Sequence, residues 1–304
     1  MHDHEHQHSH VPTGRHALIT VLIITATVLI SELVGALWSG SLALLVDAGH
    51  MLVDSSGLVI ALIAAHLMAR PRSDTHTWGF RRSEILAAAL QAGMLLIICS
   101  LALIEGIRRL ITPEPVTAGI MMIFAIIGLL GNLVGMAVLF GSRSHNLNLK
   151  AAFLEVTADT LGSVFVLIAA AITHLTGFDR ADALASLAIA AIMAPRAIHL
   201  MRQSAHILLA AAPKELDLAE VRQHILDIDH VIDCHDLHAA TIATGLHTLT
   251  AHVTVDAECM RSGHSIDILH QLQDCVAQHF PVSIEHSTFQ LDTPEHRAHE
   301  SLRH

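Results

Sequence analysis

The sequence is poor in the residues that soluble proteins carry at their surfaces. Only 15% of its 304 residues are charged, against about 25% in an average soluble domain, while 52% are hydrophobic and the mean hydropathy is +0.53. Tyrosine is absent and tryptophan occurs twice, so the aromatic residues that usually mark membrane–water boundaries are scarce. This composition excludes an ordinary soluble domain and indicates a membrane protein.

Cysteine is also scarce, and no two cysteines form a CxxC pair. The four are Cys99, Cys234, Cys259 and Cys275. This spacing argues against a disulfide framework or a zinc ribbon and fits a reducing compartment. The N-terminus, MHDHEHQHSH, lacks a basic region, and no A-x-A cleavage pattern follows the first apolar run, so we expect no signal peptide.

Charge is divided unevenly along the chain. Residues 1–212 hold 12 Lys or Arg and 13 Asp or Glu, whereas residues 213–304 hold 5 and 15. An acidic C-terminal region repels nucleic acid and anionic lipid and suits a module that handles cations. We therefore expect divalent metal ions rather than nucleic acid as partners.

Six apolar stretches are long enough to cross a bilayer, which takes about 20 residues. Their approximate bounds are 17–38, 42–69, 83–111, 116–141, 148–174 and 181–208. Basic residues favour the cytoplasmic side. Eight basic residues lie on the side of the loops that join stretches two to three and four to five, and three lie on the other side. This excess predicts that both termini are cytoplasmic. The eight are Arg70, Arg72, Arg81, Arg82, Arg143, Lys150, Arg196 and Arg202, and the three are Arg108, Arg109 and Arg180.

The pattern changes after Pro213. Residues 215–227 show helical spacing, residues 235–242 and 247–255 indicate strands around a Thr244-Gly245 turn, residues 264–280 form an amphipathic helix, and residues 282–291 form a last strand. We predict an α-helical membrane protein: a His-rich arm over 1–15, six transmembrane helices within 16–210, a cytoplasmic α+β domain of ferredoxin-like order α-β-β-α-β over 213–292, and a disordered tail over 293–304.

Ionisable side chains inside apolar spans are costly, so each is a candidate functional residue. Asp47, His50 and Asp54 lie on one face of the second span, and Glu155 and Asp159 lie four residues apart on the fifth. Two facing pairs can supply four nitrogen and oxygen ligands to one ion, as tetrahedral Zn²⁺ requires. A network of carboxylates bonded to neighbouring helices is the alternative for any single residue.

The motifs DAGHMLVD, WGFRRSEILAAALQAG, EVTADTLGS and RQSAHILL resemble the cation diffusion facilitators, in particular their zinc–cobalt–cadmium resistance branch, over residues 15–292. The resemblance implies a homodimeric metal/proton antiporter in the bacterial inner membrane, with six spans and a cytoplasmic metal-binding domain. By position, it makes His50, Asp54, Glu155 and Asp159 the transport ligands. It therefore implies Zn²⁺ efflux, with Cd²⁺ and Co²⁺ as further substrates.

Glu155 departs from the pattern, because many zinc members have histidine at its position. One imidazole and three carboxylates make a harder site, which keeps Zn²⁺ plausible and raises the chance of Mn²⁺ or Fe²⁺. Metal binding requires deprotonated ligands, so protons can displace the ion in an exchange cycle. Asp47, a turn before His50, is a candidate carboxylate on the exit path or a structural partner for another helix.

Histidines outside the spans predict further metal binding. By the resemblance, histidines match positions of the family's cytoplasmic metal ligands, with His235 and His238 as alternatives at one position: His235, His238, His252, His264 and His286. Asp292, six residues after His286, is a further candidate that would add an oxygen ligand. The thiols of Cys234 and Cys259 are further donors, although buried, inert thiols are the simpler reading. The N-terminal arm has histidine at every second position from His2 to His10, which is typical of a metal-collecting segment.

Two other function classes were weighed. An intramembrane metalloenzyme would need HExxH or an equivalent, which the sequence lacks, so we expect no enzyme. A membrane-anchored metal sensor is the second alternative, but six spans with polar faces exceed what anchoring requires. A flux assay separates a sensor from a transporter, whereas proton stoichiometry and the ranking of the metals are not encoded in a readable pattern.

Overall fold

A computed structural model describes residues 13–140 and 147–297. Within this part of the chain, six helices are long and apolar enough to cross a membrane, with mean hydropathies between 1.6 and 2.4. They are α1 (Thr13–Ser39), α2 (Leu42–Met68), α3 (Ser83–Ile111), α4 (Ala118–Phe140), α5 (Leu147–Thr176) and α6 (Arg180–Leu208). The predicted bundle of six helices is confirmed, and the ends differ from the predicted ones by at most four residues.

The first difference concerns the N-terminal arm. Helix α1 begins at Thr13, within the segment predicted as an arm over residues 1–15. Residues 14–16 are Gly, Arg and His, and the apolar run starts at residue 17, so the helix begins before the hydrophobic run itself. Residues 1–12, which carry the repeated histidines, lie outside the described residues.

The chain divides into two compact units. One contains residues 1–59 and 90–199, and the other contains residues 60–89 and 200–304. The second unit thus combines the C-terminal domain with the α2–α3 connection and the adjoining helix ends. Its boundary in α6 falls at Leu200, whereas the composition of the sequence changes at Pro213.

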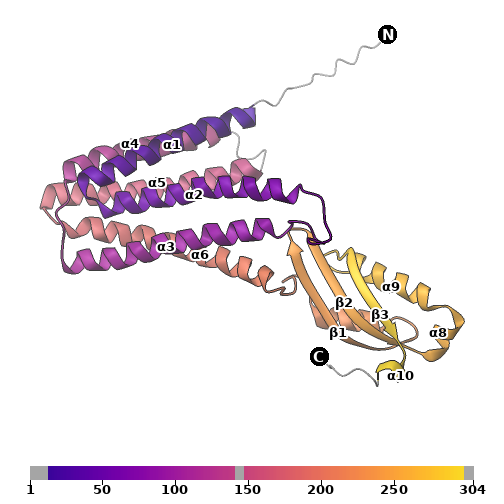
Figure 1. Cartoon of the computed structure of the whole chain (residues 1–304). Coiled ribbons are helices and arrows are strands. Elements are labelled where there is room, and N and C mark those ends of the chain that lie inside the picture. The colour runs from indigo at the N-terminus through magenta and orange to yellow at the C-terminus, as the bar shows by residue number, and fades with distance from the viewer. Residues whose placement is uncertain (1–12, 141–146, 298–304) are drawn as a thin grey trace, which may run out of the picture. The chain divides into compact units, whose positions relative to one another are not determined.

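In the helical unit, α4 packs against both α1 and α5 (Figure 1). Small residues permit the close approach: a methyl group on Gly35 would lie 2.4 Å from the Phe124 ring, and one on Gly131 would lie 2.3 Å from Val28. Close backbone contact through glycine is a common way for helices to associate in lipid, where apolar surface gains nothing from burial.

The start of α2 is fixed by a carboxylate from α6. Asp182 is 1% exposed and accepts hydrogen bonds from the hydroxyl of Ser41 at 2.5 Å and from the backbone N–H groups of Leu42 and Ala43 at 2.7 and 3.2 Å. These N–H groups have no partner inside the helix. Asp182 therefore accepts hydrogen bonds from backbone N–H groups at the start of α2 that have no partner within the helix, and it joins the first turns of α2 and α6.

Two of the three basic residues that opposed the predicted orientation, Arg108 and Arg109, are paired with acids. Arg108 forms ion pairs with Glu105 at 2.7 Å and Glu114 at 2.6 Å, and Arg109 forms one with Glu105 at 2.9 Å. Neighbouring acids thus balance both charges at this end of α3.

The C-terminal domain has the predicted α-β-β-α-β order with two short helices added. Its elements are α7 (Leu218–Leu226), β1 (Val231–Ala243), β2 (Leu246–Val255), α8 (Ala257–Ser262), α9 (Ser265–Gln278), β3 (His286–Asp292) and α10 (Pro294–Arg297). Strands β1 and β2 are antiparallel around the predicted Thr244-Gly245 turn, and β3 lies parallel to β2 after the crossover through α9 (Figure 1). Gly245 has φ +70°, which glycine adopts without strain.

Strand β1 begins at Val231, four residues before the predicted start, and two further boundaries in this domain also differ from prediction. Strand β3 begins at His286 rather than at residue 282, because Ile284 is fully buried in the core instead of pairing in the sheet. The tail predicted to be disordered from residue 293 contains α10. Proline suits the first position of a helix, and Arg297 forms an ion pair with Asp233 at 2.5 Å. Residues 298–304 lie outside the described residues.

Candidate metal centres

The predicted ligands on α2 and α5 meet inside the helical unit. His50 Nε2 lies 3.4 Å from Asp54 Oδ2 on the same helix and 3.4 Å from Asp159 Oδ1 on α5. All three side chains are buried. Tetrahedral Zn²⁺ with bonds of about 2.0–2.2 Å holds its ligand atoms about 3.3–3.6 Å apart. The two contacts of His50 therefore have the spacing of ligands to one ion.

Glu155 lies beside this group on the wall of a cavity. The cavity has a volume of about 540 Å³, and Asp54, Glu155 and Asp159 supply its charged lining between α1, α2 and α5. Glu155 is half-buried, and its carboxyl group interacts with that of Asp54. Three carboxyl groups thus face one cavity inside an otherwise apolar unit.

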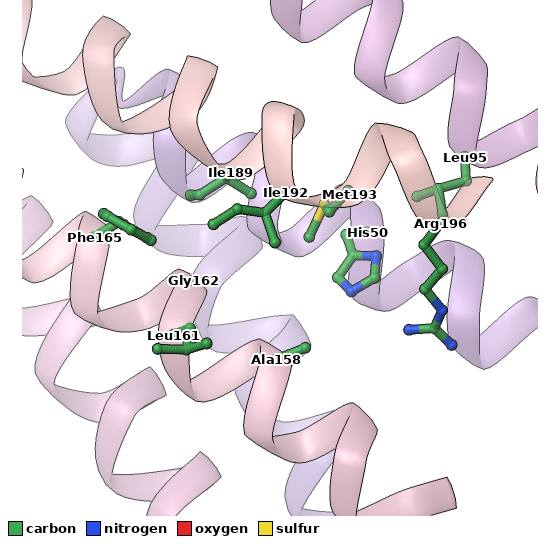
Figure 2. A pocket seen from close by; sticks show the side chains of 10 residues that line it. All are labelled: His50, Leu95, Ala158, Leu161, Gly162, Phe165, Ile189, Ile192, Met193 and Arg196. Atoms are coloured by element: carbon green, nitrogen blue, oxygen red, sulfur yellow. The ribbon is translucent and has the colours of Figure 1, made fainter. Parts of the chain in front are cut away.

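His50 lines a second, smaller cavity. This cavity has a volume of about 80 Å³ and lies between α5 and α6, with Leu161 and Phe165 on one wall and Ile189 and Met193 on the other. Figure 2 shows the His50 ring at one end of these apolar side chains. Because His50 also contacts Asp54 and Asp159, the polar group separates the two cavities.

The predicted ligands of the helical unit are close to one another, but their ligand atoms are not all gathered around one point. Among the described residues, the groups whose ligand atoms all lie within 4.8 Å of one another are both in the C-terminal domain. Asp54 Oδ2 and Asp159 Oδ1 have no hydrogen-bond partner within the described chain.

Sequence reasoning did not connect two neighbouring residues, Gln91 and Arg196, to this group. Gln91 on α3 donates a hydrogen bond from Nε2 to Asp54 Oδ1 at 3.3 Å, so it helps to orient the Asp54 carboxylate. Arg196 on α6 lines the smaller cavity together with His50 (Figure 2). An amide or a guanidinium in an apolar span was the available signal, but spacing alone did not connect either residue to α2.

Asp47 is fully buried, and neither of its oxygens has a hydrogen-bond partner among the described residues. It lies against α5 where that helix carries Gly162, since a methyl group there would be 2.6 Å from Asp47 Oδ1. A buried carboxylate without partners is costly unless it binds a proton or a cation. Glu32 on α1 is in the same condition, with 1% exposure.

Strand register brings three of the predicted C-terminal ligands together. His235 on β1 pairs directly with His252 on β2, and Asp292 on β3 pairs with Thr254, two residues further along β2. Alternate residues of a strand share a face, so all three side chains lie on the same side of the sheet, and their ligand atoms lie within 4.8 Å of one another. Both oxygens of Asp292, which is 3% exposed, lack a hydrogen-bond partner within the described chain.

The other predicted C-terminal ligands lie elsewhere. His238 is next to Asp236 at 3.2 Å, and His264 is bonded to Ser262 at 2.7 Å at the start of α9. The His286 ring packs edge-on against Trp78 of the α2–α3 connection, with 4.7 Å between ring centroids. The structure therefore does not gather these three histidines with His235 and His252 within one chain, because the β-bulge before His238 and the position of His286 at the far end of β3 separate them.

The C-terminal thiols differ in their surroundings. Burial raises the pKa of Cys234 to about 11, partly opposed by Arg222, and burial also raises the pKa values of Cys259 and Cys275. Cys234 and Cys259 belong to neither group of close ligand atoms among the described residues, which fits the inert role expected for them. Cys275 does belong to one, together with His224 and His279, and sequence reasoning missed it.

Comparison with known proteins accounts for almost the whole chain. Residues 18–209 match the cation efflux transmembrane domain, and residues 213–294 match the cation efflux protein cytoplasmic domain. The chain is 38% identical to the zinc transporter ZitB of Escherichia coli (strain K12) over 296 residues, which cover 96% of this chain and 92% of that protein.

Two further relatives agree with this assignment. The cation efflux system protein CzcD of Alcaligenes sp. (strain CT14) is 37% identical, covering 94% of this chain and 89% of that protein. The cadmium, cobalt and zinc/H(+)-K(+) antiporter of Bacillus subtilis (strain 168) is 34% identical, covering 96% and 93%. With its six helices able to span a membrane, its facing polar side chains on α2 and α5 and its α+β C-terminal domain, the chain belongs to the cation efflux family of membrane transporters, the cation diffusion facilitators.

Proposed function

We propose that this protein exports Zn²⁺ from the cytoplasm in exchange for protons, with His50, Asp54, Glu155 and Asp159 as the transport ligands. The observation that carries this proposal is the contact of His50 with carboxylates on two different helices, both at 3.4 Å. One imidazole and three carboxylates suit Zn²⁺ and leave Cd²⁺ and Co²⁺ as further substrates. The zinc transporter and the cadmium, cobalt and zinc antiporter among its relatives support this assignment.

The cavities support a stepwise path. An ion entering the larger cavity would meet the carboxylates of Asp54, Glu155 and Asp159 before reaching His50. Since the smaller cavity begins at His50, transfer of the ion requires this polar group to rearrange. Asp47, one turn from His50, is then placed as the next carboxylate, and we assign it to the exit path.

Exchange with protons follows from charge. Several carboxylates buried close together repel one another strongly in a low dielectric, so the group is stable only when it holds a cation. Binding of Zn²⁺ displaces protons from the ligands, and protons arriving from the other side displace Zn²⁺. Each cycle therefore exchanges one cargo for the other.

The orientation and assembly form part of this proposal. An excess of basic residues around the 2–3 and 4–5 loops supports cytoplasmic termini in a bacterial plasma membrane. The matching C-terminal family model is that of a cytoplasmic domain and takes its name from dimerisation, which supports a homodimer. We assign a resident Zn²⁺ to His235, His252 and Asp292 in this domain.

Purified protein in liposomes tests the exchange. Zn²⁺ uptake is followed with a trapped fluorescent indicator while an ionophore collapses the pH gradient. We expect uptake to fall when the gradient is removed and internal pH to change when Zn²⁺ is added without a preset gradient. Uptake that is unaffected by the gradient would contradict exchange, and no metal-dependent flux at all would favour a sensor.

A further inference from the structure

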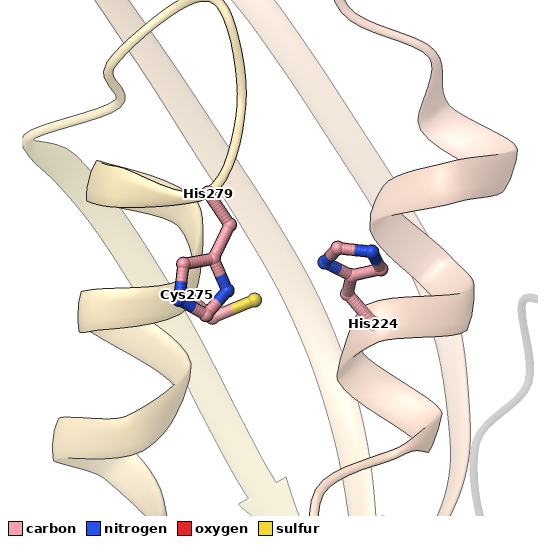
Figure 3. Close-up of side chains that lie close together, drawn as sticks. All are labelled: His224, Cys275 and His279. Atoms are coloured by element: carbon pink, nitrogen blue, oxygen red, sulfur yellow. The ribbon is translucent and has the colours of Figure 1, made fainter.

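A group of metal-binding side chains lies between α7 and α9, apart from the ligands discussed so far. It consists of His224 on α7 and of Cys275 and His279 on and just after α9, and their ligand atoms all lie within 4.8 Å of one another. Figure 3 shows the sulfur of Cys275 pointing toward His224 across the gap between the helices, with the His279 ring beside it.

The fold holds this group in place from both sides. Cys275 and His279 are one helical turn apart, and the backbone N–H of His279 donates to the carbonyl of Cys275 at 3.0 Å. Side chains four residues apart share one helix face. Both helices are anchored in the same core, α7 through Val221 and Ile225 and α9 through Leu272 and Val276, so the ligand-bearing faces meet at the edge of that core.

Ordinary packing explains only part of this arrangement. The His224 ring packs against Phe280, with 5.1 Å between centroids, and against His279 at 6.0 Å, which accounts for one histidine at a core edge. It gives no reason for a thiol to point at an imidazole. Within the described chain, the side chains of His224, Cys275 and His279 make no hydrogen bond or ion pair, so each still has its donor atom available.

The dimensions fit a small tetrahedral ion after a modest adjustment. Nitrogen and sulfur ligands of Zn²⁺ lie about 3.3–3.6 Å apart, somewhat closer than the present upper limit of 4.8 Å. His279 is exposed and able to rotate. The group opens into a groove of about 440 Å³ lined also by Asp227 and Asp274, which leaves room for a fourth ligand, either water or a carboxylate.

We propose that His224, Cys275 and His279 form a second metal site in the C-terminal domain, separate from His235, His252 and Asp292, that takes a thiol-binding divalent ion such as Zn²⁺ or Cd²⁺. One thiolate and two imidazoles select such ions over the harder Mn²⁺ or Mg²⁺. Binding converts the thiol to a metal thiolate and releases its proton to solvent, without oxidation or reduction. The bound ion links α7 to α9.

Cobalt provides the test, because a cobalt–thiolate bond gives a charge-transfer absorption that nitrogen and oxygen ligands do not give. The full-length protein in detergent, stripped of metal, is titrated with Co²⁺. We expect the thiolate band in the parent protein, its loss in Cys275→Ser, and its displacement by Zn²⁺ or Cd²⁺. Cys259→Ser is the matched control, since Cys259 is also a buried thiol of this domain and its removal should leave the band unchanged.

The histidines give a second, independent readout. Because His279 is exposed, His279→Gln should fold normally and weaken Co²⁺ binding by about 10-fold or more, as should His224→Gln. His270→Gln removes another exposed histidine of α9 and should have no effect. A band that is absent from the parent protein, or that persists in Cys275→Ser, would overturn the proposal.

Failure of this site is distinguishable from failure of the transport proposal. Asp54→Asn removes a transport ligand and should leave the cobalt–thiolate band intact. Conversely, the loss of the cobalt–thiolate band in Cys275→Ser is measured by absorption in detergent and does not depend on transport. The two proposals therefore stand or fall on separate measurements.

Discussion

The helical unit and the C-terminal domain assemble their candidate metal ligands in opposite ways. In the helical unit, His50 Nε2 lies 3.4 Å from an oxygen of Asp54 and 3.4 Å from an oxygen of Asp159, beside a cavity of about 540 Å³. Among the described residues of the C-terminal domain, there are two groups of three side chains whose ligand atoms all lie within 4.8 Å of one another. The candidate ligands of the helical unit are divided between two long helices, α2 and α5, whereas those of the C-terminal domain lie on paired strands or on helices anchored in one core.

This difference matches two different tasks. A transport site must release its ion in each cycle, so ligands that require helix movement to enclose the ion are an advantage. A resident ion benefits from ligands that the fold already holds together, because little conformational entropy is lost on binding. The comparison predicts that substitutions in the helical unit change flux and that substitutions in the C-terminal domain change bound metal.

The largest effect is expected from Asp54→Asn. The amide preserves the size of the side chain and its contact with Gln91 but removes one negative charge and a strong oxygen ligand. We expect Zn²⁺ flux in liposomes to fall to the level of empty vesicles, while metal binding by the C-terminal domain is retained. Asp74→Asn, in the exposed α2–α3 connection, is the control and should transport normally. Flux comparable with the parent protein in Asp54→Asn would remove this residue from the transport site.

His252→Ala tests the other side of the comparison. We expect one fewer bound Zn²⁺ per chain and a smaller rise of the unfolding temperature on adding Zn²⁺, since an ion at 100 times its Kd stabilises a fold by about 2.7 kcal/mol. Calorimetry and thermal unfolding measure both quantities. Flux should remain far above that of Asp54→Asn.

His238→Ala is the matched substitution for His252→Ala. It removes a neighbouring histidine that the structure places outside the group. If both variants lost the same amount of metal, the register of the sheet would not define the site.

Glu155→His should have a smaller effect, on selectivity. Replacing a carboxylate by an imidazole makes the site softer, so we expect the ratio of Zn²⁺ to Mn²⁺ flux to rise several-fold. Competition between the two ions in the liposome assay measures this ratio. Glu155→Gln separates the loss of charge from the gain of the imidazole. An unchanged ratio in Glu155→His would show that Glu155 does not contact the ion.

The smallest effect is expected from deleting residues 2–11. Metal bound by the histidines of this segment would raise the Zn²⁺ concentration near the transporter without changing the transport step itself. We expect flux to fall about 2-fold or more at limiting Zn²⁺ and to be unchanged at saturation. Replacing the five histidines of this segment by asparagine keeps its length and should have the same effect. A lower saturating rate would contradict a purely collecting role.

The parts of the molecule that follow from local periodicity were predictable from the sequence. The six helices follow from hydrophobic length, and the pairing of His50 with Asp54 follows from their four-residue spacing on α2. Their contact with Asp159 required α2 and α5 to face each other, which rested on the costly charges in both spans and on the family resemblance.

The parts that depend on pairing between distant segments were not predictable. Asp292 joins His235 and His252 only because of the register of three strands, and the same register leaves His238 out. His224 and Cys275 are 51 residues apart in sequence and meet because α7 and α9 share a core. Asp182 gave no sign in the sequence of capping a helix some 140 residues earlier.

That cap has a mechanical consequence. Through Ser41, Leu42 and Ala43, Asp182 ties the beginning of α2 to the beginning of α6 by three hydrogen bonds. If α2 tilts so that His50 becomes accessible from the other side of the membrane, the first turn of α6 must therefore move with it. The pivot of such a movement then lies at the joined first turns of α2 and α6, and the opposite ends of the two helices move farthest.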